Sequence, residues 1–122
     1  MPAEPILIDS IYDSVRDQLG VVDDAFDPAI MMHINSVFSI LYELGVGPAT
    51  PYRITSKENS WSEFITRNDI ELVKSYVGLR VRQLFDPPST ATMYEAVEKS
   101  IKELEWRLLV TVDHQVEESS DE

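Results

Sequence analysis

Apolar residues recur every three or four positions in several stretches, most clearly on both sides of Asp86-Pro87-Pro88. One-sided stripes with this period are typical of amphipathic helices. The prolines lack N–H donors and disfavour helical geometry in the preceding residue, so the first helix should end near Phe85. The short turn then predicts an antiparallel helical hairpin. The stripe before the turn is Val73, Tyr76, Val77, Val81 and Leu84, and the stripe after it is Met93, Val97, Ile101, Leu104 and Leu108.

Two further helices are expected upstream of this hairpin. Residues 7–19 carry one apolar face, and Gly20 suits the left-handed position that ends a helix. Asp27-Pro28 predicts the next helix start, with Asp27 as N-cap and the helix running to about Leu44. Val22 and Phe26 are expected to anchor the connection between them. The stripes are Ile8, Ile11, Val15 and Leu19, then Ile30, Ile34, Val37, Leu41 and Leu44.

Residues 45–68 form the one long irregular loop of the chain. TPYRIT is a candidate extended stretch, and Asn59 or Ser60 can cap a short helical turn that Trp61 would pin to the core. A loop of this length is often functional, but a packed surface flap is an equally good interpretation. The predicted fold is therefore an all-α bundle of about four helices with one long irregular loop and an acidic C-terminal tail.

Some residues of the hairpin lie outside its two stripes. Asp69 is expected to cap the helix that ends near Phe85, and a second face of that helix contains Glu71, Ser75, Gly78 and Arg82. A glycine inside a helix costs ~1 kcal/mol relative to alanine. Gly78 therefore indicates close approach of another backbone, or is simply tolerated. Trp106 and Leu109 suggest that the last helix has apolar neighbours on two sides. Arg80, at the stripe edge, can pair with a buried acid or, more commonly, extend its stem over the core.

The last helix should begin at Thr92, which forms a capping-box pattern with Glu95, or nearer Ser89. Three acid-first pairs, Glu95–Lys99, Glu98–Lys102 and Glu103–Arg107, would support it. Residues 111–122 carry five acids and no base. We therefore expect a helical domain over 1–110 and a flexible acidic tail over 111–122, in which Val112 and Val116 could order against a partner.

Composition narrows the function classes. The chain has 122 residues, no cysteine, and a formal net charge of −12 from 22 acidic and 10 basic side chains. Such a charge disfavours binding to DNA, and it indicates either a solubilising surface or one that lies near DNA without binding it. We expect no signal peptide and no membrane span. The two histidines are isolated and no catalytic motif is present, so we expect no enzyme activity, no metal and no cofactor.

Three runs of the chain, 31–48, 71–88 and 101–109, resemble the small head-tail connector proteins of tailed phages, also called adaptor or head-completion proteins. The residues that carry the resemblance are HINS with the following LGVGP, then LFDPP, then EWRL. The resemblance covers roughly residues 6–110. It implies a helical bundle that forms a ring, usually of twelve copies, between the portal protein and a stopper or tail-completion protein. Genome DNA would pass through the ring, which lies in the virion neck after assembly in the host cytoplasm.

The expected contacts with other subunits or partners follow from the ring that the resemblance implies and from the residues that lie outside the two main stripes or in the tail. They involve Glu71, Ser75, Gly78, Arg82, Trp106, Leu109, Val112 and Val116. The alternative function is an acidic DNA mimic that inhibits a host nuclease or regulator, which would need regular rows of unpaired acids. A small enzyme is a third reading, with no constellation of residues behind it.

Overall fold

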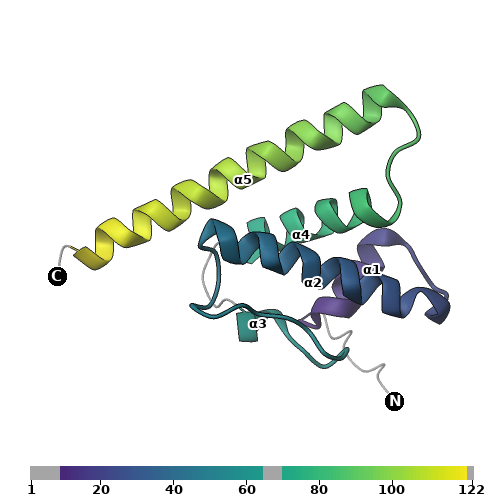
Figure 1. Ribbon diagram of the computed structural model, residues 1–122, viewed down its shortest axis with the longest axis horizontal. Helices are drawn as coiled ribbons and strands as arrows, with labels where there is room; N and C mark the ends of the chain where they lie inside the picture. Colours follow the sequence, from purple (N-terminus) through teal and green to yellow (C-terminus); the bar gives the residue numbers. More distant parts are fainter. Residues whose placement is uncertain (1–8, 65–69, 121–122) are drawn as a thin grey trace, which may run out of the picture.

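The computed structural model describes residues 9–64 and 70–120, with only the backbone described from 112 to 120 (Figure 1). The described chain is helical and contains no strand, only an isolated bridge between Ser10 and Ser60. The prediction of an all-α bundle with four long helices is confirmed. The elements are α1 (Ile11–Leu19), the 3-10 turn η1 (Asp24–Phe26), α2 (Asp27–Leu44), α3 (Trp61–Phe64), α4 (Ile70–Phe85) and α5 (Ala91–Ser120).

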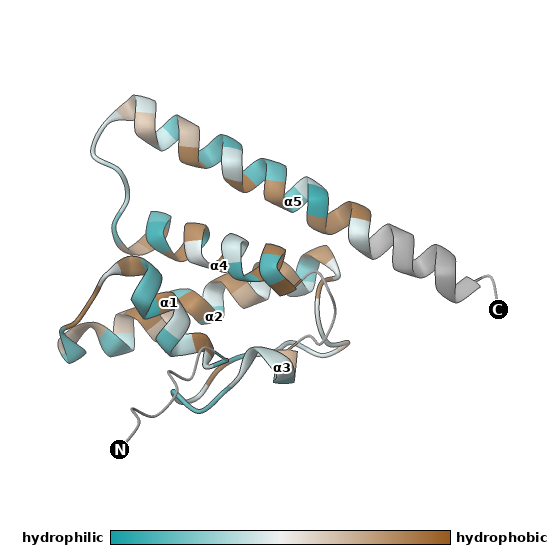
Figure 2. Ribbon diagram, turned by 180° about the vertical axis from the view of Figure 1, so that it is seen from behind, coloured by the Kyte–Doolittle hydropathy of each residue, from teal (hydrophilic) through white to brown (hydrophobic). Residues whose placement is uncertain are grey.

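Helix α4 is the centre of the fold, because α1, α2 and α5 all pack against it. Figure 1 shows α5 along one side of α4, with α1 and α2 on the other side. Figure 2 shows apolar residues on the surfaces of α1, α2 and α4 that face one another. Removal of these side chains from water is the main stabilising term of such a bundle. The largest fully buried side chains are Trp61, Tyr12, Tyr76, Phe38, Ile11, Ile30, Ile34, Leu41, Ile101, Leu108, Val15 and Val37.

The helix ends agree only partly with prediction. Gly20 and Gly45 end α1 and α2 in the left-handed conformation, with φ of 71° and 82°, as expected. The prediction that Asp27 caps α2 is wrong, because Asp27 is already helical and its carboxylate is held by other groups. The Tyr12 hydroxyl donates a hydrogen bond to it, and Lys57 Nζ lies 3.1 Å from its Oδ2.

Residues 45–64 pack onto the bundle as a flap. The Asn35 side-chain amide accepts from Ile54 N at 2.7 Å and donates to Ile54 O at 3.0 Å, so it satisfies both backbone groups as a neighbouring strand would. The Trp61 indole donates to Ser14 Oγ at 2.8 Å. Val46, Ile54, Trp61 and Phe64 are all buried. The flap interpretation therefore describes the observed packing, and the candidate extended stretch TPYRIT, residues 50–55, forms no strand.

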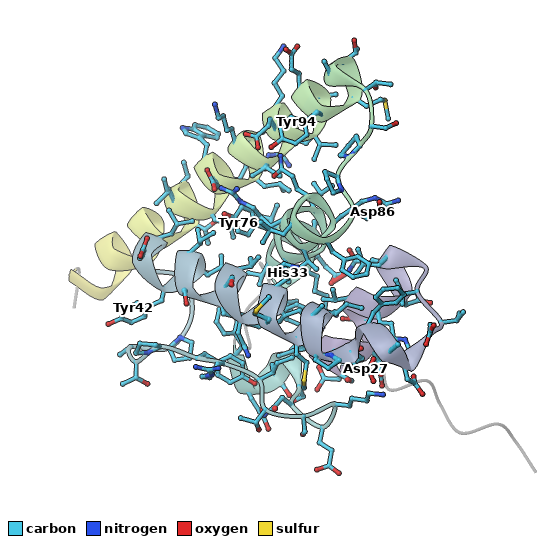
Figure 3. All side chains as sticks on the ribbon, turned by 45° about the vertical axis from the view of Figure 1, so that its right-hand side comes forward. Asp27, His33, Tyr42, Tyr76, Asp86 and Tyr94 are labelled. Atoms are coloured by element: carbon cyan, nitrogen blue, oxygen red, sulfur yellow. The ribbon has the colours of Figure 1, made fainter. Side chains whose placement is uncertain are left out.

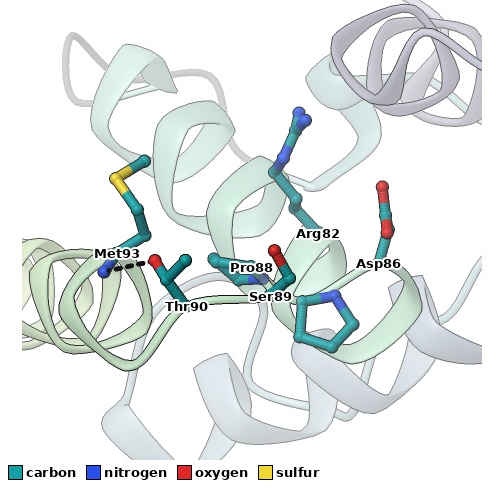
Figure 4. Close-up of a pocket in the computed structure, with 7 residues that line it drawn as sticks. Arg82, Asp86, Pro88, Ser89, Thr90 and Met93 are labelled. Atoms are coloured by element: carbon teal, nitrogen blue, oxygen red, sulfur yellow. Dashed lines mark hydrogen bonds between the residues drawn. The ribbon is translucent and has the colours of Figure 1, made fainter.

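The turn between α4 and α5 begins where Pro87 and Pro88 were expected to end the preceding helix. Helix α4 ends at Phe85 as predicted, whereas its expected cap, Asp69, lies outside the described residues. Thr92 does not cap α5: Thr90 holds the N-cap position, with its Oγ1 accepting from Met93 N at 3.3 Å (Figure 4). The helix therefore begins nearer Ser89, as the alternative start predicted.

Four residues expected to be buried or to anchor the core are exposed: Val22 (90%), Phe26 (46%), Leu84 (48%) and Met93 (59%). For Met93 the reason is positional, since residues 91–96 are all exposed and the first turns of α5 lie outside the packed region. Helix α5 also extends further than predicted, to Ser120. Residues 111–120 contain no proline or glycine to end it. Ile8, which was assigned to the first stripe, lies outside the described residues.

Candidate assembly surface

Helix α5 is attached to the bundle through α4. Ile101 and Leu108 are fully buried in this contact, and Val97 and Leu104 are partly buried. Residues two turns apart on one helix lie on the same side of it. The inner side of α5 is thus fixed by the subunit core, and its outer side is left for other contacts.

A polar cluster reinforces the contact between α4 and α5, and we call it the α4–α5 clasp: Tyr76, Arg80 and Glu105. Tyr76 Oη donates to Glu105 Oε2 at 2.6 Å, and Arg80 Nη2 donates to the same oxygen at 2.7 Å. Arg80 Nε also donates to Tyr76 Oη at 3.1 Å. Figure 3 shows Tyr76 projecting from α4 toward α5. Arg80 is therefore paired with a partly buried acid, which is the less common of its two predicted roles.

The clasp perturbs the titration of its members. Burial raises the pKa of Tyr76 to about 12, and the hydrogen bond to Glu105 adds to this effect. Burial alone would raise the pKa of Glu105, but hydrogen bonds from Tyr76 and Arg80, with the Arg80 charge, outweigh it and lower that pKa. Glu105 therefore remains ionised and holds the two helices together at neutral pH.

The ion pairs expected along α5 are found only in part. Glu103 and Arg107 form the predicted ion pair at 3.0 Å. Glu98 accepts a hydrogen bond from the buried Gln83 of α4, whereas Lys102 was its predicted partner. Acids that pair with neighbouring groups in this way do not form the rows of unpaired charge that a DNA mimic requires.

The outer side of α5 carries an apolar group that the subunit does not cover. Trp106 is 65% exposed, Leu109 40% and Val110 45%. We call these three residues the α5 outer patch. Lys99 and Lys102, on the same helix, are exposed beside it. The sequence predicted Trp106 and Leu109 at a second contact, and both are open to solvent in the subunit. Val112 and Val116 lie further along α5, with side chains outside the described residues.

The predicted face of α4 does not join this patch. Glu71 and Ser75 are exposed, but Gly78 is buried against α1. A Cβ at Gly78 would clash with Gln18 Oε1, so the close neighbour of this glycine is a side chain of the same chain. Arg82 is exposed and donates to Gln18 O at 3.4 Å. Gly78 and Arg82 therefore face α1, at a different place from Trp106 and Leu109.

A second exposed apolar group was missed by the sequence analysis. Val22 and Phe26 (46% exposed) lie in the connection between α1 and α2, and we call them the α1–α2 patch. The Phe26 ring packs edge-on against Phe85, at 5.5 Å between centroids, and its remaining surface is open. Asp23 and Asp24 lie between the two apolar residues and are exposed. The expectation that both residues anchor the connection fails for Val22, because no helix in the part of the chain that the structure describes covers this turn.

Two open surface hollows are formed by the described residues, and neither has a recognisable catalytic arrangement. Figure 4 shows the hollow at the α4–α5 turn, which has Arg82, Asp86, Thr90 and Met93 in its lining. A second groove, between α2 and the flap, is lined by Met31, Met32, Tyr52, Ile54 and neighbouring residues. In the described residues, no three His, Cys, Asp or Glu side chains converge as metal ligands would. The same part of the chain contains no helix long and apolar enough to cross a membrane.

Comparison with known proteins gives one informative result. No curated protein matches the chain, and no solved structure matches it. A family model described as phage connector protein matches residues 11–115, from the start of α1 to within the C-terminal part of α5. Because this match covers most of the chain, the protein belongs to the phage connector protein family.

Proposed function

We propose that this protein is a head-tail adaptor: it forms a ring between the portal protein and the stopper or tail-completion protein of a tailed phage, and genome DNA passes through that ring. Membership of the connector family indicates a structural role at the connection between head and tail. The observation that carries the finer proposal is the α5 outer patch. A large aromatic side chain and two aliphatic ones on a well-packed helix are typical of a surface that another protein covers.

The net charge suggests how the ring forms. Each subunit carries −12, so subunits repel one another at long range and apolar contacts must overcome that repulsion. A symmetric template that holds subunits side by side would supply the missing association energy as an increased local concentration. We therefore expect a weakly associating monomer in isolation and a ring of twelve copies on the portal.

The same charge suits passage of DNA. Lysines and arginines facing the channel would bind phosphates and release counterions, which would hold the DNA in place. An acidic channel avoids this binding. The mechanism is thus binding and geometry without catalysis, since the adaptor reproduces the symmetry of the portal and presents a docking surface to the next component.

The last part of the chain is proposed as a docking element. Residues 111–122 carry five acids and no base, and Val112 and Val116 are spaced so that they could be buried against a portal or neighbouring subunit. Because α5 continues into this segment, it could reach a partner without any movement of the bundle.

Co-sedimentation with the portal tests the proposal. The wild-type chain should sediment alone as a monomer and should move with the portal when the two are mixed. Trp106→Ser should weaken this association, whereas Tyr94→Ser, a matched loss of an exposed aromatic from α5, should preserve it. A stable compact dimer that ignores the portal would contradict the adaptor function.

A further inference from the structure

Two exposed apolar patches of this chain differ in the charge that surrounds them. The α5 outer patch (Trp106, Leu109 and Val110) is accompanied by Lys99 and Lys102, and also by Glu103 and Arg107, which neutralise each other in an ion pair of 3.0 Å. In the part of the chain that the structure describes, neither lysine is in an ion pair. The α1–α2 patch (Val22 and Phe26) encloses Asp23 and Asp24. Asp24 binds Arg16 at 2.9 Å, yet its side chain remains 79% exposed.

The two patches cannot meet within one subunit. Phe26 packs against Phe85 at the C-terminal end of α4, whereas Glu105, next to Trp106, is bonded to Tyr76 in the first half of α4. These α4 positions are about 14 Å apart along the helix axis at the usual rise per residue. Figures 1 and 2 agree that the α1–α2 connection and the C-terminal half of α5 lie toward opposite ends of the bundle.

We propose that the α5 outer patch of one subunit docks on the α1–α2 patch of a second copy. Trp106 and Leu109 would pack on Val22 and Phe26, while the two lysines would face Asp23 and Asp24 of the neighbour. The occupant is a second copy because this chain itself offers the required partner chemistry, an exposed apolar group flanked by acids. Opposite charges beside an apolar contact set the register and disfavour the like-with-like alternative, in which two lysine-flanked patches would meet.

This contact joins two different surfaces, so each subunit keeps one of each kind free for the next neighbour. Such a head-to-tail contact generates a ring when the rotation closes and a filament when it does not. The inference rests on the proposed function to the extent that it assigns the contact between ring neighbours. It is nevertheless a statement about self-association that can be tested without a portal.

Site-specific crosslinking tests it directly, because the chain has no native cysteine. Ala25→Cys and Val110→Cys place thiols at the edges of the two patches and leave Trp106, Leu109, Val22 and Phe26 in place. In one full-length chain at high protein concentration, a short bismaleimide should give a ladder of covalent oligomers, with residue 25 of one copy linked to residue 110 of another. Ala25→Cys with Ser36→Cys, an exposed position on α2, is the matched control and should remain monomeric.

The charge complementarity is tested in the same assay. Lys102→Glu should lower the yield of the 25–110 crosslink by roughly an order of magnitude. Arg53→Glu, an equal charge change at an exposed position on the flap, should leave that yield unchanged.

The remaining outcomes separate this inference from the function. Efficient dimers from Val110→Cys alone would mean that two outer patches face each other, which overturns the head-to-tail contact. Portal co-sedimentation without any 25–110 crosslink, in solution or on the portal, would also overturn it while leaving the adaptor function intact. A 25–110 ladder from a protein that never binds the portal would support the contact and contradict the function.

Discussion

Arg80 of α4 and Glu105 of α5 are joined by a hydrogen-bonded ion pair of 2.7 Å, and Tyr76 donates to the same carboxylate oxygen at 2.6 Å. The three side chains lie beside the apolar contact of Ile101 and Leu108. Since one carboxylate holds two donors from the other helix, its loss leaves both without their acceptor. This relationship fixes the position of α5 on the bundle, and with it the direction in which Trp106 points.

Loss of the clasp carboxylate should destabilise the protein. Glu105→Ala should lower the free energy of unfolding by ~1–3 kcal/mol, because partly buried hydrogen bonds to a charged group are lost. Lys102→Ala, an exposed change on the same helix, should have an effect within about 0.5 kcal/mol. Urea unfolding of the single variants, with Arg80→Ala and the double variant, gives the coupling energy. A coupling near zero would mean that the clasp does not hold α5.

Stability should fall on both sides of neutral pH. The pKa of Glu105 is lowered in the fold, so its contribution is present above the unfolded carboxyl pKa and is lost as the pH falls through the folded value. The pKa of Tyr76 is raised to about 12, so its contribution is present below the unfolded tyrosine pKa of about 10 and declines as the pH rises toward 12. Melting temperature measured against pH should show both changes.

Two variants show which residue causes the loss of stability at acid pH and which causes it at alkaline pH. Glu105→Gln should make the acid side of the profile less steep, and Tyr76→Phe should do the same on the alkaline side. Part of each slope should remain, because the pKa of Asp27 is also lowered, mainly by its hydrogen bond from Tyr12, and the pKa of Tyr12 is also raised, mainly by burial. Profiles that keep the wild-type shape in both variants would assign the pH dependence to other groups.

The apolar residues of the predicted α5 stripe should contribute unequally to the free energy of unfolding. Ile101 is fully buried, so Ile101→Ala should cost ~2–5 kcal/mol of unfolding free energy. Met93 belongs to the same predicted stripe but is 59% exposed, so Met93→Ala should cost far less. Thermal or urea unfolding distinguishes the two. Equal losses would show that the first turns of α5 pack as tightly as its middle.

The acidic segment should matter for assembly more than for folding. Truncation after Val110 removes five acids and no base, and every core residue among the described side chains is retained. We expect an unchanged melting temperature, together with heads that fill with DNA but fail to retain it or to accept tails. Phage yield and electron microscopy of the particles measure this effect. A normal phage yield would mean that residues 111–122 only increase solubility and do not dock on a partner.

The local signals in the sequence predicted the fold well. Proline geometry placed the end of α4 at Phe85, the glycines placed the ends of α1 and α2, and the apolar period identified all four long helices. Errors arose where a residue has more than one possible partner. Asp27 had the pattern of a cap, yet Tyr12 and Lys57, distant in sequence, hold its carboxylate.

The assembly surface could be predicted only in part, for the same reason. Trp106 and Leu109 stood off the main stripe of α5, which indicated a second contact. The sequence predicts Val22 as an anchor of the connection between α1 and α2, and no local pattern indicates that this turn is left uncovered. The pairing of Arg80 with Glu105 likewise depends on the register between α4 and α5, which periodicity alone does not determine.

The most direct test of the adaptor function is electron cryo-microscopy of the full-length protein mixed with its portal. We predict one ring on the tail-side end of the portal, with one copy per portal subunit, an open central channel, and Trp106 in a contact with a neighbouring subunit. A portal that remains bare beside monomeric protein at high concentrations of both would contradict the account.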